Sequence, residues 1–233
     1  MGKIVWSPKK EHILSSQMWD FMLKVNEKHN ILLKGYDELY SWTIANPQLF
    51  WDDIWEYCDI IHSFPYTQVV DDITSMPGAK WFPSVRLNFA ENLLRFRDDR
   101  PALVFRREDK LERTLSYKDL FSLVAQTSSA LKSAGITSGD RVAGFIPNIP
   151  EAVIAMLAAA SIGAVWSSSS PEFGIKGVLD RFSQIEPKVL FTADGYFYNG
   201  KRFDSLKILE EILKQLPSVE KVVIIPYTNK SPE

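Results

Sequence analysis

The sequence predicts an α/β fold, in which a mostly parallel sheet carries helices on both faces and is preceded by a helical N-terminal cap. From Arg141 onward, short apolar runs of strand length alternate with stretches of helical periodicity, which is typical of a parallel sheet covered on both sides. Before about residue 61, by contrast, apolar residues recur at helical spacing. The chain has 233 residues, 45% of them hydrophobic and 24% charged, which is enough for a sizeable core.

The N-terminal segment is predicted to form two helical regions, Glu11–His29 and Tyr36–Ile61. Asn46 and Pro47 divide the second, since asparagine favours the N-cap and proline the first turn of a helix. Its aromatic residues fit either a docking face for a partner or a cap over the edge of the next domain, and the cap is favoured because apolar stripes are usually core. Prolines and glycines then indicate a connecting loop. We therefore predict a helical cap and linker over residues 1–83 and an incomplete α/β domain over residues 84–233.

The α/β part is predicted to open with two short elements, a helix at Leu87–Leu94 and a strand at Ala102–Phe105. The charged stretch Arg106–Glu112 is interpreted as a solvated hairpin tip. Ser116, with Asp119 three residues later, is predicted to cap a helix that ends at Gly135.

The stretch from Gly139 to Gly174 predicts a strand, a crossover helix and a second, parallel strand. These elements are expected at Val142–Ile146, at Pro150–Ile162 and at Ala164–Trp166, and four serines follow them. Another helix is expected to begin at Pro171 and to cover residues 175–185. The same alternation continues with a strand at 189–192, a helix at 205–216 and a strand at 221–226.

Composition disfavours several classes of function. A net charge of -2 and an isoelectric point near 6.0 provide no basic patch, so neither nucleic acid nor a membrane is an expected partner. Cys58 is the single cysteine and allows no internal disulfide, and the chain shows no targeting signal or membrane-length apolar run, so a cytoplasmic location is expected. The three histidines lack the spacing of metal ligands, so no metal site is predicted.

Short motifs assign no catalytic residue, because the sequence has no GxGxxG after a strand, no GxxxxGK[ST] and no GxSxG. The tract Ser167–Ser170 is a candidate for ligand contact. It follows a strand and precedes a helix, at the sheet edge where open α/β folds bind ligands. Alternatively, Ser170 only caps the helix expected to begin at Pro171.

Three long strings of the sequence resemble one family: WFPSVRLNFAENLL from Trp81, SGDRVAGFIPNIPEAVIAMLAAASIGAVWSSSSPEFG from Ser138, and LDRFSQIEPKVLFTADGYFYNGKRFD from Leu179. In them the chain resembles the AMP-forming acyl-CoA synthetases, and most closely the members that activate acetoacetate. VWSP (Val5–Pro8) and YDELYSW (Tyr36–Trp42) are similar to the helical leader of those members. The resemblance covers nearly the whole chain.

The resemblance implies a ligase that works in two steps. A short carboxylate such as acetoacetate, or alternatively acetate or propionate, attacks ATP to give an acyl adenylate and pyrophosphate. Coenzyme A then displaces AMP to give a thioester, and Mg²⁺ accompanies ATP. The family's phosphate loop, adenosine-binding motifs and catalytic lysine would lie beyond Glu233, so we expect an N-terminal portion that is inactive alone and binds none of these cofactors tightly. A non-catalytic α/β binding or interaction module is the alternative, because a fold does not fix a function.

The resemblance also implies a site for coenzyme A. In related acetyl-CoA synthetases, the loop that corresponds to Gly200, Lys201 and Arg202 is basic and contacts the coenzyme's phosphates. The resemblance also implies that Ser168 lines the same coenzyme site. Tyr198 stands where those relatives have a further arginine, and Ser168 and the serine before it stand in place of paired glycines. Side chains there would narrow the coenzyme's path. The alternative is an ordinary solvated basic loop.

Overall fold

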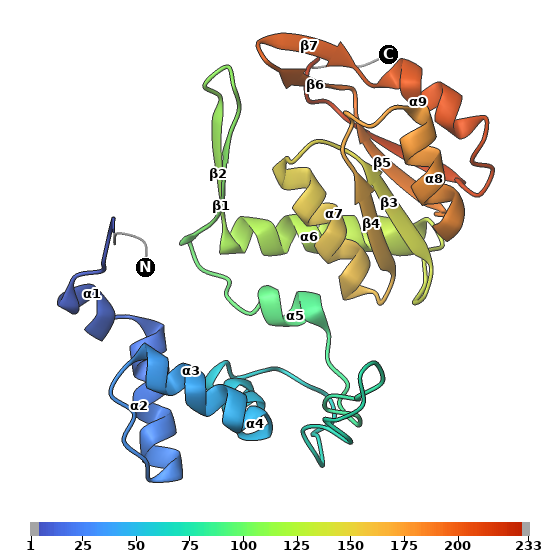
Figure 1. The fold of residues 1–233 in the computed structure, drawn as a ribbon. Coiled ribbons are helices and arrows are strands. Elements are labelled where there is room, and N and C mark those ends of the chain that lie inside the picture. The colour runs from blue at the N-terminus through green and yellow to red at the C-terminus, as the bar shows by residue number, and fades with distance from the viewer. Residues whose placement is uncertain (1–4, 230–233) are drawn as a thin grey trace. The chain divides into compact units, whose positions relative to one another are not determined.

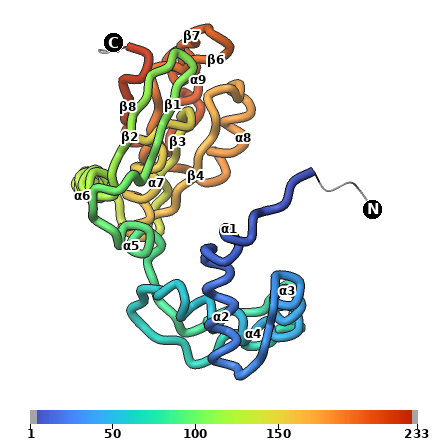
Figure 2. Tube along the Cα trace, turned by 90° about the vertical axis from the view of Figure 1, so that its left-hand side faces the viewer, coloured from blue at the N-terminus to red at the C-terminus, as the bar shows by residue number. Residues whose placement is uncertain are grey.

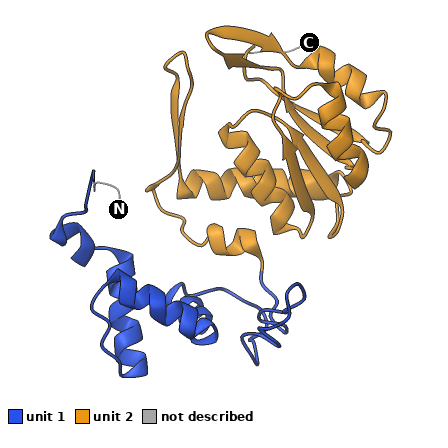
Figure 3. Cartoon of the chain, in the orientation of Figure 1, with its two compact units in different colours: residues 1–87 blue, residues 88–233 orange. Residues whose placement is uncertain are grey.

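The computed structural model describes residues 5–229 and divides the chain into two compact units, residues 1–87 and residues 88–233 (Figure 3). The first unit is helical and the second is α/β (Figure 1).

The first unit contains α1 (Lys10–Leu14), α2 (Gln17–His29), α3 (Tyr36–Ala45) and α4 (Pro47–Tyr57). The helix predicted over residues 11–29 is broken, because Ser16 caps α2 by accepting a hydrogen bond from the Trp19 backbone N–H. Pro47 starts α4 as predicted. Asn46 does not cap it, since its side-chain amide donates to the Trp42 carbonyl at 3.1 Å instead.

The core of the first unit is formed by Phe21, Met22, Val25 and Leu39, with the rings of Trp42, Phe50 and Tyr57 packed against it. Part of the predicted aromatic stripe is therefore internal packing of this unit. Residues 58–88 form neither helix nor regular strand and carry two isolated bridges, Phe64 with Arg86 and Val70 with Trp81, which agrees with the predicted loop. Phe82 of this loop lies 4.8 Å from Trp55 of α4, measured between ring centroids.

The second unit confirms the predicted α/β architecture. Its helices are α5 (Phe89–Leu93), α6 (Tyr117–Ser133), α7 (Pro150–Ser161), α8 (Ile175–Ile185) and α9 (Leu206–Leu213). Its strands are β1 (Pro101–Arg106), β2 (Glu112–Ser116), β3 (Arg141–Phe145), β4 (Val165–Ser169), β5 (Val189–Ala193), β6 (Gly195–Tyr198), β7 (Lys201–Asp204) and β8 (Lys221–Ile225). Within the described residues, the main sheet has the strand order β4-β3-β5-β8, all parallel, and β1–β2 and β6–β7 form antiparallel hairpins.

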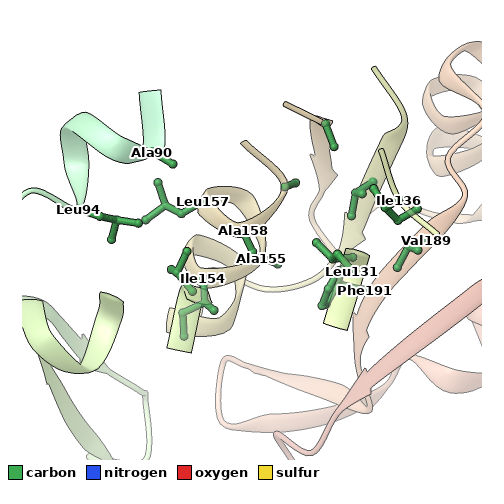
Figure 4. Close-up of a cluster of buried hydrophobic side chains, with 14 of the residues drawn as sticks. Ala90, Leu94, Leu131, Ile136, Ile154, Ala155, Leu157, Ala158, Val189 and Phe191 are labelled. Carbon is green, nitrogen blue, oxygen red and sulfur yellow. The ribbon is translucent and has the colours of Figure 1, made fainter. Parts of the chain in front are cut away.

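Alternation along the central strands divides the core between the two faces of the sheet. Val142 of β3 and Phe191 of β5 pack with α5, α6 and α7, in the cluster drawn in Figure 4. Their strand neighbours Ala143 and Leu190 pack with α8 and α9 on the other face. This period of two, with apolar residues on both faces, is what a buried parallel strand requires.

The predicted ends of α6 are confirmed. Ser116 and Asp119 form a reciprocal capping box, in which each side chain accepts from the other's backbone N–H at 3.1 Å. Gly135 follows the helix with a φ of 87°, a left-handed conformation that suits glycine.

Two predicted boundaries are wrong. Strand β4 extends through Ser169, so three of the four serines belong to the strand, and α8 begins at Ile175 with Gly174 as its N-cap. Ser170 therefore caps no helix at Pro171. It opens a turn, because its carbonyl accepts from the Phe173 N–H at 3.2 Å.

Candidate functional site

The four candidate residues lie on two different parts of the second unit. Ser168 is exposed on β4, opposite Gly144 of β3. Gly200, Lys201 and Arg202 belong to the β6–β7 hairpin, which follows β5 directly. In the strand order, β3 separates β4 from β5. Phe145 pairs with both Ser169 and Thr192, so the ends of β4 and β5 stand at the same level of the sheet.

The segment predicted as a basic loop is a tight hairpin, and this corrects the interpretation of Lys201 and Arg202. Asn199 and Gly200 have φ values of 50° and 71°, and they connect the two strands as a two-residue turn of type I′. Lys201 pairs with Tyr198, and Arg202 with Phe197. Asn-Gly between alternating aromatic residues is a strong hairpin signal in sequence, and it could have predicted this element.

The two cations lie on opposite faces of the hairpin, because successive side chains of a strand alternate. Lys201 shares its face with Tyr198 and with the stacked rings of Tyr196 and Phe203, whose centroids are 5.0 Å apart. Both cations are exposed, and within residues 5–229 neither forms an ion pair with a carboxylate. Their charges are therefore available to an anionic ligand that reaches around the hairpin.

The turn is held by the β1–β2 hairpin, whose tip was expected to be solvated. The Glu108 carboxylate accepts hydrogen bonds from two successive backbone amides, Asn199 N–H at 3.1 Å and Gly200 N–H at 3.0 Å. Figure 2 shows the tip between β1 and β2 beside β6, β7 and β8. The tip is solvated as predicted, since all of residues 106–112 except Arg107 are exposed. Its contact with the turn was not predicted, because backbone amides 91 and 92 residues away leave no mark on the local pattern of charge.

Arg107 makes the second contact from this tip. Its guanidinium lies 4.6 Å from the Phe197 ring centroid and 5.2 Å from that of Tyr227, and it donates to the Tyr227 carbonyl at 3.0 Å. An ion pair with Asp109 at 2.6 Å raises the pKa of Arg107 and lowers that of Asp109. The tip is thus fixed to both β6 and the segment after β8.

Asp194 anchors the base of the β6–β7 hairpin. Its side chain is buried and accepts four hydrogen bonds of 2.7–2.8 Å, from the backbone amides of Tyr227, Thr228 and Asn229 and from the Thr228 hydroxyl. Burial raises the pKa of Asp194, but these hydrogen bonds outweigh it, so the pKa lies below its usual value.

Gly195 follows at a point without room for a side chain. A Cβ there would approach the Phe203 carbonyl oxygen closer than van der Waals contact permits. Sequence reasoning missed Asp194, Gly195, Arg107 and Glu108. For the first two a signal existed, because Asp-Gly directly after a buried strand marks a turn.

A second cluster of titratable groups, in the first unit, is internally satisfied. Lys28 of α2 contacts Asp52 at 3.1 Å, Asp53 at 2.7 Å and Glu56 at 2.8 Å, all on α4. Partial burial opposes the charge of Lys28, but the three carboxylates outweigh it and raise its pKa. His29 pairs with Asp53 at 2.7 Å and thus joins the same two helices. Across the described residues, no group of three or more His, Cys, Asp or Glu side chains is arranged to hold a metal ion.

None of the helices in the described part of the chain has both the length and the apolar character that crossing a membrane requires.

The comparisons with known proteins agree over the whole chain. Residues 89–233 match the model of the family described as AMP-binding enzyme, and residues 36–93 match that described as acetyl-coenzyme A synthetase N-terminus. Acetoacetyl-CoA synthetase of Macaca fascicularis is 43% identical over 232 residues, and that of Rhizobium meliloti is 42% identical over 227 residues. Each alignment covers 97% of this chain and 34% of the relative.

A malonamoyl-CoA synthetase of Penicillium aethiopicum is 40% identical over 218 residues, which is 91% of this chain and 30% of that protein. Among solved structures, acetoacetyl-CoA synthetase from Streptomyces lividans superposes with a TM-score of 0.92 at 38% identity, covering all of this chain and 36% of that one. The chain thus spans about a third of the length of the relatives it matches.

Proposed function

The chain belongs to the AMP-binding enzyme family, and on this premise we propose that it supplies the N-terminal portion of an acid–CoA ligase. In the proposed reaction, a carboxylate oxygen attacks the α-phosphorus of ATP and releases pyrophosphate, and the thiol of coenzyme A then displaces AMP from the acyl adenylate. The observation that carries this proposal is 43% identity to acetoacetyl-CoA synthetase over nearly the whole chain.

Acetoacetate is the proposed carboxylate, because the relatives from an animal and from a bacterium are both named for it. Acetate or propionate is the second candidate, favoured by the match of residues 36–93 to the acetyl-coenzyme A synthetase N-terminus. The rate of ATP–pyrophosphate exchange by the complete protein is measured with acetoacetate, acetate, propionate or malonamate as the carboxylate. The carboxylate that supports the fastest exchange identifies the substrate. Exchange with none of them would favour a non-catalytic binding module.

ATP, Mg²⁺ and coenzyme A are the proposed cofactors. Within this chain, the β6–β7 hairpin fits coenzyme A, because Lys201 and Arg202 are exposed cations without an ion-pair partner among residues 5–229 and can donate hydrogen bonds to phosphate oxygens. Since these cations lie on opposite faces, we propose that they contact different phosphates of the coenzyme. We also propose that Ser168, the last residue but one of β4, lines the coenzyme's binding site.

We propose a corresponding division of labour along the chain. Residues 1–83 would serve as the helical cap and linker, and residues 84–233 as the first part of the large adenylate-forming domain. The relatives are about three times as long as this chain, so we expect residues 1–233 on their own to show no pyrophosphate exchange. Carboxylate-dependent exchange by these residues alone would contradict that expectation.

The coenzyme site is tested by reversing both charges. In the complete protein, Lys201→Glu together with Arg202→Glu is expected to raise the Michaelis constant for coenzyme A by roughly tenfold or more, because two charge-assisted contacts become repulsive. Pyrophosphate exchange, which precedes coenzyme binding, should retain most of its rate.

The matched control reverses two exposed lysines on α8 and α9, Lys176→Glu with Lys207→Glu, and changes the net charge by the same amount. An equal effect in both double variants would indicate a general electrostatic effect. An unchanged dependence on coenzyme A in the first would remove Lys201 and Arg202 from the site.

A further inference from the structure

We propose that Glu108 is a positioning residue for coenzyme A, acting through the β6–β7 hairpin; this inference rests on the proposed function of Lys201 and Arg202. Its carboxylate receives both turn amides, Asn199 N–H at 3.1 Å and Gly200 N–H at 3.0 Å. Nothing in the local sequence around Glu108 distinguishes it from the other acids of the same charged tip.

The hairpin needs such a contact to hold one conformation. A two-stranded hairpin is only marginally stable by itself, and β6 and β7 pair only with each other in the described residues. Its base is fixed by Asp194, and one side is fixed by Arg107 against Phe197 at 4.6 Å. Glu108 fixes the remaining free end, directly beside Lys201.

This contact leaves the charges of the cations available. The two oxygens of Glu108 are engaged by backbone amides, and within residues 5–229 no ion pair joins Glu108 to Lys201 or Arg202. A hairpin fixed before binding loses less conformational entropy when a ligand orders its side chains. Removing Glu108 should therefore weaken coenzyme binding, although the loss of a negative charge would by itself favour a phosphate ligand.

A competing hypothesis predicts the opposite effect. Successive backbone N–H groups can bind anions, so the Glu108 carboxylate could instead stand in for a phosphate that displaces it. In that case, removing the carboxylate would free the turn amides and strengthen coenzyme binding. The sign of the change in the Michaelis constant separates the two hypotheses.

The test uses Glu108→Gln and Glu108→Ala in the complete protein, with Glu112→Gln as the control. Glu112 lies on the same β1–β2 hairpin, is exposed and pairs with Arg106, so its replacement removes the same charge without touching the β6–β7 turn. Two quantities are measured: hydrogen exchange of the peptide that contains Asn199 and Gly200, and the Michaelis constants for coenzyme A and ATP.

We expect faster exchange at the turn, and a rise of roughly threefold to tenfold in the Michaelis constant for coenzyme A relative to that for ATP. Both effects should be larger in Glu108→Ala than in Glu108→Gln, because glutamine keeps one acceptor oxygen. In Glu112→Gln, the hydrogen-exchange rate at the turn and the Michaelis constants should equal those of the wild type. Unchanged hydrogen exchange at the turn would overturn the proposal, as would a lower Michaelis constant for coenzyme A. Faster exchange with no kinetic change would also overturn it if the Lys201–Arg202 charge reversal still weakens coenzyme binding. If that reversal has no effect either, the proposed coenzyme site itself has failed.

Discussion

Replacing Asp194 tests whether one buried carboxylate holds the C-terminal part of the α/β unit together. Asp194 is 2% exposed, and its carboxylate accepts hydrogen bonds from the backbone amides of Tyr227, Thr228 and Asn229 and from the Thr228 hydroxyl. These bonds join the segment after β8 to the base of the β6–β7 hairpin. Asp194→Ala removes every acceptor at once, whereas Asp194→Asn keeps the oxygen that faces Tyr227 and Thr228.

The expected magnitude follows from what each variant leaves unpaired. A hydrogen bond to a charged group contributes about 1.5–3 kcal/mol, but Tyr227 and Thr228 are only partly buried and Asn229 is exposed, so water replaces some lost partners. We therefore expect Asp194→Ala to lower the free energy of opening by about 3 kcal/mol, well below the sum over four bonds. In Asp194→Asn the new amide group faces the Asn229 N–H, donor against donor, and about 1–2 kcal/mol should be lost.

Native-state hydrogen exchange of the amides in β5 and β8 measures this free energy directly. These amides should exchange roughly a hundredfold faster in Asp194→Ala than in the wild type and roughly tenfold faster in Asp194→Asn, since each 1.4 kcal/mol is a factor of about ten in the exchange rate. Asp99→Ala, at an exposed position of the same unit, is the control. Exchange of Asp194→Ala within about twofold of the wild type would refute the reasoning, as would greater damage from the asparagine variant.

The lowered pKa of Asp194 fixes the sign of the pH dependence. A carboxyl whose folded-state pKa lies below its unfolded value stabilises the fold above the unfolded value, near 3.9. That stabilisation is lost as the pH falls through the lower, folded-state pKa. The difference between the wild type and Asp194→Ala should therefore be full at neutral pH and shrink in acid.

Two further changes in the second unit have expected outcomes. Gly195→Ala should lower the free energy of unfolding by about 2 kcal/mol or more, because the new Cβ meets the Phe203 carbonyl, which is backbone and cannot rotate away; a melting temperature equal to the wild type's would contradict this. Lys188→Met should raise the pKa of Asp140 from about 2 toward its usual value, since Lys188 contacts that carboxylate at 2.7 Å. Carboxyl NMR titration measures the pKa of Asp140. A pKa that stays near 2 in the variant would show that the hydrogen bonds from the Thr137 N–H and hydroxyl, and not Lys188, lower it.

The sequence predicted the parallel core well because its signals are local. The apolar runs that became β3, β5 and β8 have strand length, and the glycines and capping residues between them mark helix ends. The ends of β4 and α8 were misjudged for a physical reason. Serine is a common turn residue, so the local sequence favours an end of the strand after Trp166, but pairing with β3 extends β4 through Ser169.

The candidate site was predicted less well, because its geometry depends on distant partners. Lys201 and Arg202 were singled out by resemblance, but their placement on opposite faces follows from the β6–β7 hairpin, which was not predicted. Glu108 could not have been identified from its neighbours. Its role depends on two backbone amides, and backbone groups are the same at almost every position of a sequence.

The contact between Glu108 and Gly200 also has a consequence for synthesis of the chain. Its two residues are 92 positions apart, and Arg107 reaches Tyr227 across 120 positions. At a ribosomal rate of about 5–20 residues per second, the β1–β2 hairpin emerges roughly 5–20 seconds before the turn that it holds. During that interval the hairpin can pack on α6, which follows it directly, as Leu115 and Leu120 do in one buried cluster, but its tip lacks both partners and its strand edges stay open to wrong pairing. Residues 101–116 are therefore the part of this unit where we expect a nascent chain to depend most on chaperone protection.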